Sequence, residues 1–290
     1  MTLAFVLQLI ISGFLMGGVY SLIALGLSLI FGVMKVINFA HGEMMVWGMY
    51  IAYTILVLTG VDPFFSLVVS AGALFVLGYL LQRIVVNRII EFPEAMQVIP
   101  MIGAALIFEN GARLIWGPDY RSPASKFALS SVWIGEVMID VPRLFAFLIS
   151  ILITGLVFLF LKYADIGKAI RSSADNRLGA LLVGTDVNRV YAICFGIGAA
   201  CVGAAGALLV SLMPFAPHSG PPFTMISFII VILGGMGSLM GAMVGGLIVG
   251  IAESVATLFL PSSLKQIVSF SLMIFILLFR PKGLFGRSQG

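Results

Sequence analysis

Long apolar runs separated by short polar connections dominate the pattern of this sequence. A transmembrane helix needs about 20 apolar residues to cross roughly 30 Å of hydrocarbon. The runs that meet or approach this length are residues 3–33, 44–58, 64–86, 98–116, 144–161, 190–212, 223–260 and 267–279. The pattern predicts an all-α, polytopic transmembrane helical bundle with about eight or nine membrane segments, some of them broken at glycines.

Two of these runs are too long for one simple crossing. The first carries Gly13, Gly17 and Gly18, so we expect a helix that is tilted or broken. The run 223–260 is interrupted by Gly234, Gly235 and Gly237. It is either two crossings or a half-helix followed by a full helix. Adjacent glycines inside an apolar run indicate a helix break, which is tolerated at membrane depth where the backbone lines a cavity.

Composition excludes a soluble fold. Hydrophobic residues make up 61% of the chain and charged residues 10%, whereas soluble domains carry about 25% charged residues. The net charge of +4 does not indicate a nucleic-acid partner, because the basic residues lie in short connections rather than in one stripe. Cys194 and Cys201 are seven residues apart, which does not fit a CxxC metal or redox pair. Neither a metal nor a cofactor is expected.

The distribution of Lys and Arg predicts the orientation. With the N-terminus in the periplasm and the C-terminus in the cytoplasm, eleven basic residues fall in inner connections and five in outer ones, which satisfies the positive-inside rule. The inner group is Lys35, Arg83, Arg88, Lys162, Lys168, Arg171, Arg177, Arg189, Arg280, Lys282 and Arg287, and the outer group is Arg113, Arg121, Lys126, Arg143 and Lys265. Ends on opposite sides require an odd number of crossings, which favours nine.

The two longest connections differ in character. The outer one, 117–142, contains prolines and aromatic residues, whereas the inner one, 162–189, is the most charged part of the chain. Within the inner loop, residues 175–183 have helical character and little apolar content, which is typical of a short helix on the cytoplasmic surface. No linker separates a second unit, so residues 1–290 form a single membrane-spanning domain.

Regularly spaced glycines predict close helix packing. Gly13-x3-Gly17 and Gly237-x3-Gly241-x3-Gly245 each lay small residues along one helix face. In lipid, such faces let two backbones approach and gain van der Waals contact.

Polar residues within the apolar runs have two interpretations. Asn38 is placed to cap the helix that follows it, and Glu43 lies in the first turns, where the helix dipole favours a negative charge. Alternatively, His41 and Glu43 face an internal pathway or gate, since ionisable groups at membrane depth are usually functional. Glu109 in the fourth run and Glu253 near the end of 223–260 are expected to face protein or a water-filled cavity. The candidate pathway or gate residues are Asn38, His41, Glu43, Glu109, Gly234, Gly235 and Gly237.

Motifs of catalysis are missing from the sequence. It contains no phosphate-binding G-x4-GK[ST] loop, no HExxH and no GxSxG. The chain is therefore not expected to be an enzyme or to hydrolyse ATP by itself.

Several stretches together resemble one transporter family. They are Gly18-Val19-Tyr20-Ser21-Leu22-Ile23-Ala24-Leu25-Gly26, Ile37-Asn38-Phe39-Ala40-His41-Gly42-Glu43, Gly184-Thr185-Asp186, Leu233-Gly234-Gly235-Met236-Gly237-Ser238, and Arg280-Pro281-Lys282-Gly283-Leu284-Phe285-Gly286. In order and spacing the chain resembles the permeases of branched-chain amino acid ABC transporters, and best the shorter of their two permease subunits.

This resemblance implies partners and a docking loop. A second related permease subunit, two cytoplasmic ATP-binding subunits and a periplasmic solute-binding protein would complete an importer in a bacterial inner membrane. The loop 162–189 would engage the ATPase. By the same resemblance, its coupling residues are Ala174, Asp175, Asn176, Ala180 and Gly184, although Ala174-Asp175-Asn176 stands where other ABC permeases have Glu-Ala-Ala.

The function that follows is ATP-driven import of branched-chain, apolar amino acids, with ATP hydrolysed by the partners. Two alternatives stay open at this point: a passive channel or a secondary transporter for small neutral solutes such as urea or short amides. A channel does not need a charged docking loop, and a secondary transporter would use Glu43, Glu109 or Glu253 to carry protons.

Overall fold

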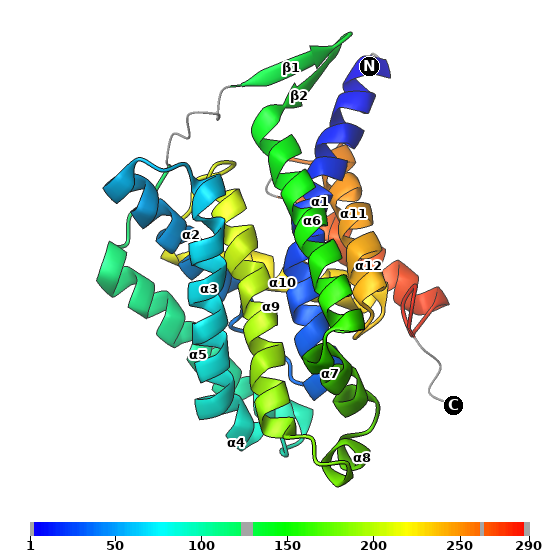
Figure 1. Ribbon diagram of the computed structural model, residues 1–290. Helices are drawn as coiled ribbons and strands as arrows, with labels where there is room; N and C mark the ends of the chain where they lie inside the picture. The colour runs from blue at the N-terminus through cyan, green and yellow to red at the C-terminus, as the bar shows by residue number, and fades with distance from the viewer. Residues whose placement is uncertain (1–2, 123–129, 262–263, 287–290) are drawn as a thin grey trace.

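The computed structural model describes residues 3–122, 130–261 and 264–286 (Figure 1). Lys126 and Arg287 of the charge count lie outside these ranges. The elements are α1 (Leu3–Met34), α2 (His41–Thr59), α3 (Pro63–Leu81), the π-helical turn η1 (Gln82–Val86), α4 (Asn87–Ile89), α5 (Glu94–Trp116), β1 (Ser131–Ile134), β2 (Val137–Asp140), α6 (Val141–Tyr163), α7 (Asp165–Asp175), α8 (Arg177–Leu182), α9 (Val187–Leu209), the 3-10 turn η2 (Pro217–Ser219), α10 (Gly220–Gly234), α11 (Leu239–Ala256) and α12 (Lys265–Phe279).

The predicted helical bundle is confirmed. Within the described ranges, eight helices are long and apolar enough to cross a membrane. They are α1, α2, the continuous stretch Pro63–Ile89, α5, α6, α9, the stretch Pro217–Gly234 and α11, and α12 is a shorter apolar helix. Most ends of the predicted runs lie within a few residues of the ends of these helices.

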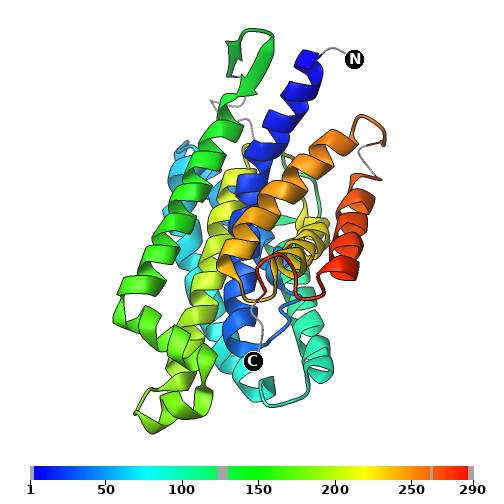
Figure 2. The same ribbon diagram turned by 90° about the vertical axis from the view of Figure 1, so that its right-hand side faces the viewer.

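Helix α1 is the central element of the bundle and is unbroken, so the alternative of a break at its glycines is wrong. It runs for 32 residues, or about 48 Å, and lies between α6, α9 and α11 (Figures 1 and 2). Gly13 and Gly17 pack against α11, and Gly18 packs against Phe147 of α6, instead of bending the helix. A Cβ added at Gly250 would lie 2.5 Å from the Cα of Gly17, and one added at Gly17 would lie 2.9 Å from the carbonyl oxygen of Gly246. The predicted packing role of these glycines is confirmed.

Helix α9 makes similar close contacts on its other sides. Between α2, α3 and α9, the Ser70 hydroxyl lies 2.9 Å from the carbonyl oxygens of both Gly48 and Gly203. The ring of Phe75 lies against Gly196, where an added Cβ would be 2.9 Å from the ring. Small residues thus place α9 against α3 with little space between the backbones.

The run 223–260 forms two helices joined by a tight turn. Gly235 and Gly237 adopt positive φ angles of 101° and 82°, which side chains with a Cβ rarely adopt. The turn is covered by the C-terminal segment, because the backbone N–H of Leu284 donates to the carbonyl of Leu233 at 2.9 Å. The N–H of Phe285 donates in the same way to the carbonyl of Gly234. The last carbonyls of α10 are therefore paired by residues about 50 positions later in the chain.

A β-hairpin at the N-terminal end of α1 is an element that the sequence interpretation missed. Strands β1 and β2 pair antiparallel, with Ser131 opposite Asp140, around a turn in which Gly135 has a φ of 64°. The side chain of Gln8 bonds both the carbonyl and the N–H of Met138. The hairpin and the first turns of α1 consequently project together from the bundle (Figure 1).

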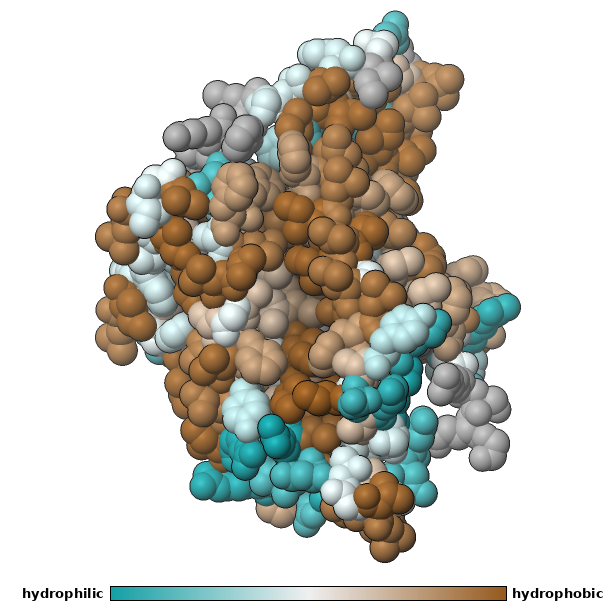
Figure 3. Space-filling view, viewed as in Figure 1, coloured by the Kyte–Doolittle hydropathy of each residue, from teal (hydrophilic) through white to brown (hydrophobic). Residues whose placement is uncertain are grey.

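The opposite end of the molecule carries η1, α4, α7 and α8 and most of the hydrophilic surface visible in Figure 3, while the body above it is apolar.

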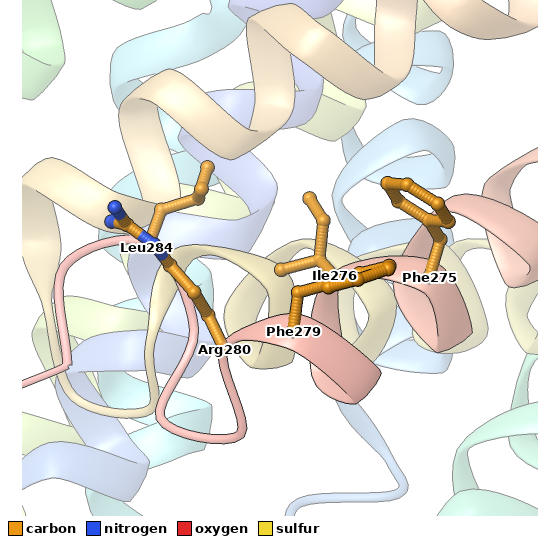
Figure 4. A pocket seen from close by; sticks show the side chains of 5 residues that line it. All are labelled: Phe275, Ile276, Phe279, Arg280 and Leu284. Atoms are coloured by element: carbon orange, nitrogen blue, oxygen red, sulfur yellow. The ribbon is translucent and has the colours of Figure 1, made fainter.

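An open apolar hollow of about 260 Å³ lies beside the end of α12, where the rings of Phe275 and Phe279 stand on one side and Arg280 and Leu284 on the other (Figure 4).

Candidate functional site

The chain turns back into the bundle between α1 and α2. Lys35, with a φ of 55°, ends α1, and residues 35–40 then run without regular structure to the start of α2. The Nε2 atom of His41 lies 2.9 Å from the carbonyl oxygen of Ile23, a residue 11 positions before the end of α1. At 1.5 Å per residue, α2 therefore begins about 16 Å inside that end of α1.

A second helix begins at the same place. The N–H of Gly42, in the first turn of α2, donates to the hydroxyl of Thr224 in the first turns of α10 at 2.9 Å. A side chain at Gly42 would collide with the backbone of Gly220, where α10 begins. We call the meeting point of the two helix starts the helix-start junction and define it as Asn38, His41, Gly42, Glu43, Gly220 and Thr224.

Asn38 does not cap α2 as the sequence predicted. Its side-chain oxygen accepts from the N–H of Ala40 at 3.0 Å, which stabilises the turn before the helix. Ala40 is the N-cap residue and offers no side-chain acceptor, so Thr224 from α10 supplies the acceptor for the first turn of α2. The predicted capping function exists, but it comes from a residue 182 positions away.

Glu43 supplies the carboxyl group of the helix-start junction. It is only 4% exposed, and its Oε2 atom lies 3.5 Å from the hydroxyl of Thr224. Gly220 at the start of α10 packs against the backbone and carboxyl carbon of Glu43. Each helix start carries roughly half a positive charge from its aligned peptide dipoles. The carboxylate of Glu43 therefore lies where two such starts converge.

Apolar side chains border the helix-start junction. The rings of Phe39 and Phe228 lie 5.2 Å apart, and both are partly exposed. Met225, one residue after Thr224, is 39% exposed. The surroundings thus combine one carboxylate, two helix starts and an apolar border.

The other predicted pathway residues belong to other elements. Glu109, on α5, forms an ion pair with Arg113 of the same helix at 2.5 Å, with its side chain partly exposed. It also lies near enough to Glu43 for the two carboxyl groups to interact electrostatically. Gly234, Gly235 and Gly237 form the turn between α10 and α11, against Gly32 and the C-terminal segment. The structure therefore brings together Asn38, His41 and Glu43 with Glu109 nearby, whereas the three glycines lie elsewhere.

Glu253 belongs to a separate buried network. Its carboxylate accepts from the hydroxyls of Tyr20 at 3.1 Å and Ser269 at 2.8 Å, and Lys265 lies 3.8 Å away. These contacts join α1, α11 and α12 through one buried carboxylate. Within the described residues, no cluster of His, Cys, Asp or Glu side chains could hold a metal ion.

Comparison with known proteins identifies the family. The profile of the family described as branched-chain amino acid transport system / permease component matches residues 9–277. The chain belongs to this family. The match covers the helix-start junction, the charged loop and every helix that is long enough to cross the membrane.

Individual permeases are similar over nearly the full length. The high-affinity branched-chain amino acid transport system permease protein LivH of Escherichia coli (strain K12) is 32% identical, covering 98% of this chain and 96% of the relative. BraD of Pseudomonas aeruginosa, described as a permease protein of the same kind of system, is 31% identical over the same shares. A probable branched-chain amino acid transport permease protein LivH of Methanocaldococcus jannaschii is 30% identical, covering 91% and 88%. No solved structure matches.

The charged loop of this permease forms two helices rather than one. Helix α7 ends at Asp175, and Asn176 starts α8 by accepting from the N–H of Gly179 at 2.9 Å. In α7, the hydrogen bond from Lys168 lowers the pKa of Asp165. The helix expected at 175–183 is thus confirmed as α8, Arg177–Leu182. It is separated from α7 at Asn176, whose side chain accepts a hydrogen bond from the backbone N–H of Gly179.

Helix α8 presents apolar side chains at the charged end of the permease. Leu178, Leu182 and Val183 are 73%, 89% and 80% exposed, whereas Ala180 is buried against the bundle. Gly184 follows the helix with a φ of 83°, and an added Cβ there would meet no atom within 4 Å. Exposed apolar residues on a polar surface mark an interaction site.

Proposed function

We propose that this chain is a permease subunit of an ATP-driven importer that carries branched-chain, apolar amino acids across the inner membrane of a bacterium. The observation that carries the proposal is the family match over residues 9–277, together with relatives of nearly equal length whose names state this transport. The charge distribution supports a periplasmic N-terminus and a cytoplasmic C-terminus. A second permease, two ATPases and a periplasmic binding protein complete the importer.

Helices α7 and α8 form the ATPase-docking surface in this proposal. Leu178, Leu182 and Val183 supply apolar contacts outside the membrane, where water would otherwise cover them. Gly184 supplies the left-handed turn that ends α8. Ala174, Asp175, Asn176, Ala180 and Gly184 are accordingly the coupling residues, with Asn176 and Ala180 fixing the position of α8 rather than contacting the ATPase.

The transport pathway passes the helix-start junction in this proposal. An amino acid carries a carboxylate, an ammonium group and, for this class, an apolar side chain. Half-helix starts at membrane depth attract carboxylates, and Glu43 offers the charge that pairs with an ammonium group. The rings of Phe39 and Phe228 and the side chain of Met225 fit the apolar part.

The remaining pathway candidates take supporting positions. His41 holds the start of α2 against α1, and Asn38 closes the turn before it, so their role is to position Glu43. Glu109 lies on α5 near the junction, where it pairs with Arg113 and acts electrostatically on Glu43. Gly234, Gly235 and Gly237 form a turn that a gating movement of α10 would use as its hinge.

Uptake of labelled leucine tests the importer function. Cells lacking their own importer receive this chain together with its neighbouring transporter genes. We expect uptake that requires ATP and is lost with Leu182→Asp, which puts a charge on the docking surface, while insertion stays normal. Uptake that persists without any ATPase would instead favour a channel, and uptake that follows the proton gradient would favour a secondary transporter.

Glu43→Gln tests the pathway. We expect it to lower leucine uptake by at least tenfold while the ATPase still co-purifies, because the neutral amide no longer balances the ammonium group. Glu94→Gln is the matched control at an exposed carboxylate outside the junction and should retain most uptake. Equal losses in both variants would show that the pathway does not depend on the helix-start junction.

A further inference from the structure

An open apolar groove of about 480 Å³ lies on the face of the bundle formed by α3, α6, α7 and α9, within the size range of small-molecule sites. Its lining is Phe75 from α3, Ile153, Leu156, Val157 and Phe160 from α6, Ile166 from α7, and Ile193 and Ile197 from α9. Figure 3 shows this apolar face hollowed along its middle, with hydrophilic surface at its lower end. The helix-start junction lies elsewhere, so the groove is separate from the proposed pathway.

One wall and the floor of the groove each lead to an arginine at the charged end. On α3 and η1, Phe75, Tyr79 and Arg83 follow one another at intervals of four, which places them on one helix face. The ring of Phe75 lies 6.5 Å from that of Tyr79, and the Arg83 guanidinium lies over the Tyr79 ring at 5.5 Å and donates to its hydroxyl. An unbroken line of side chains thus leads from the groove to a cation.

The floor of the groove shows the same order. Ile197, Ile193 and Arg189 follow one another at intervals of four along α9, with Arg189 exposed at its beginning. Within the described ranges, neither Arg83 nor Arg189 has a carboxylate within ion-pair distance. The neighbouring carboxylate of Asp165 is paired with Lys168 at 2.9 Å, and that of Asp186 accepts from the backbone N–H of Arg189.

We propose that this groove binds one anionic phospholipid, with an acyl chain against the isoleucines and the phosphate between Arg83 and Arg189. The lining offers almost no polar atoms, which fits a hydrocarbon chain and excludes a polar solute. The two arginines have no carboxylate partner within the described ranges and can therefore pair with a phosphate, which distinguishes this site from ordinary lipid contact. Planar guanidinium groups suit phosphate oxygens because they donate in parallel pairs.

Native mass spectrometry of the purified full-length chain tests the proposal. After delipidation, the protein is mixed with phosphatidylglycerol or with phosphatidylcholine, and bound lipid is counted. We expect wild type to retain one phosphatidylglycerol. The double variant Arg83→Gln with Arg189→Gln should bind it about thirtyfold more weakly, since each basic residue near a membrane contributes about 1 kcal/mol.

The control variant removes the same charge elsewhere at this end. Arg88→Gln with Arg177→Gln should retain phosphatidylglycerol as wild type does, because neither arginine follows the side chains that line the groove and Arg177 already pairs with Glu91. Ile197→Trp, which fills the groove, should lower retention while leaving both arginines in place, and a thermal melt verifies that each variant is folded. The proposal would be overturned if wild type retained phosphatidylcholine as well as phosphatidylglycerol, or if both double variants retained phosphatidylglycerol equally. It would also be overturned if this face cross-linked to another permease.

Discussion

Replacing Thr224 by Val tests whether the two helix starts stabilise each other. The change keeps the shape of the side chain and removes only the hydroxyl, so it creates no cavity. Thr224 is 2% exposed and accepts the N–H of Gly42 at 2.9 Å. Its other contacts, to Phe39 and Glu43, are both 3.5 Å long, at the limit of a hydrogen bond. The capping bond is therefore the main loss.

The magnitude follows from the buried donor left behind. An unpaired buried N–H costs about 1–3 kcal/mol, while hydrogen bonds between membrane helices average about 0.6 and reach about 1.7 kcal/mol. We expect Thr224→Val to lower the free energy of unfolding by about 1–2 kcal/mol. The measurement is reversible unfolding in mixed micelles, followed by circular dichroism.

Thr154 provides a matched control for the same chemical change. It is 1% exposed on α6, and its hydroxyl has no hydrogen-bond partner within the described residues. Thr154→Val removes an unpaired polar group, so it should leave the free energy of unfolding unchanged or raise it slightly. If the two valine variants unfold with equal free energies, the hydroxyl of Thr224 does not stabilise the helix-start junction and the reasoning fails.

Three further tests address other parts of the structure. Gly250→Ala forces a methyl group into the backbone of α1 and should lower the melting temperature strongly, whereas Gly155→Ala, with open space around it, should leave it unchanged or raise it. Tyr20→Phe leaves the buried carboxylate of Glu253 without one donor, so we expect a loss of about 1–3 kcal/mol in unfolding, and a loss near zero would contradict the network. Gly184 has a left-handed backbone conformation, which Asn tolerates and β-branched side chains do not. Gly184→Asn should therefore preserve co-purification of the ATPase, and Gly184→Val should reduce it. Equal binding of the ATPase by both variants would refute the argument.

The sequence predicted the helices well because lipid imposes a simple rule on them. Each crossing needs a continuous apolar run, so hydropathy located α3, α5, α6 and α9 directly. Glycine spacing also predicted that one face of α1 packs closely, but not that its partner is α11. The same glycines were misleading as signs of a break in α1, because a helix tolerates glycine where a neighbouring backbone fills the space.

The helix-start junction was only half predictable. The polar residues Asn38, His41 and Glu43 marked the segment, since charge at membrane depth requires a reason. Their partner Thr224 gave no signal, because a lone threonine in an apolar helix resembles any packing residue and lies 182 positions away. The hairpin of β1 and β2 was missed although Gly135 indicated its turn, because the short strands lie in a connection that was interpreted only as a loop.

The pairing of the C-terminal segment with α10 sets an order for biogenesis. The carbonyls of Leu233 and Gly234 accept from the N–H groups of Leu284 and Phe285. A chain that emerges from the ribosome N-terminus first therefore cannot pair these two carbonyls until residues 284 and 285 have been made. We expect a chain that ends before residue 280 to leave both carbonyls without these donors and to melt at a lower temperature.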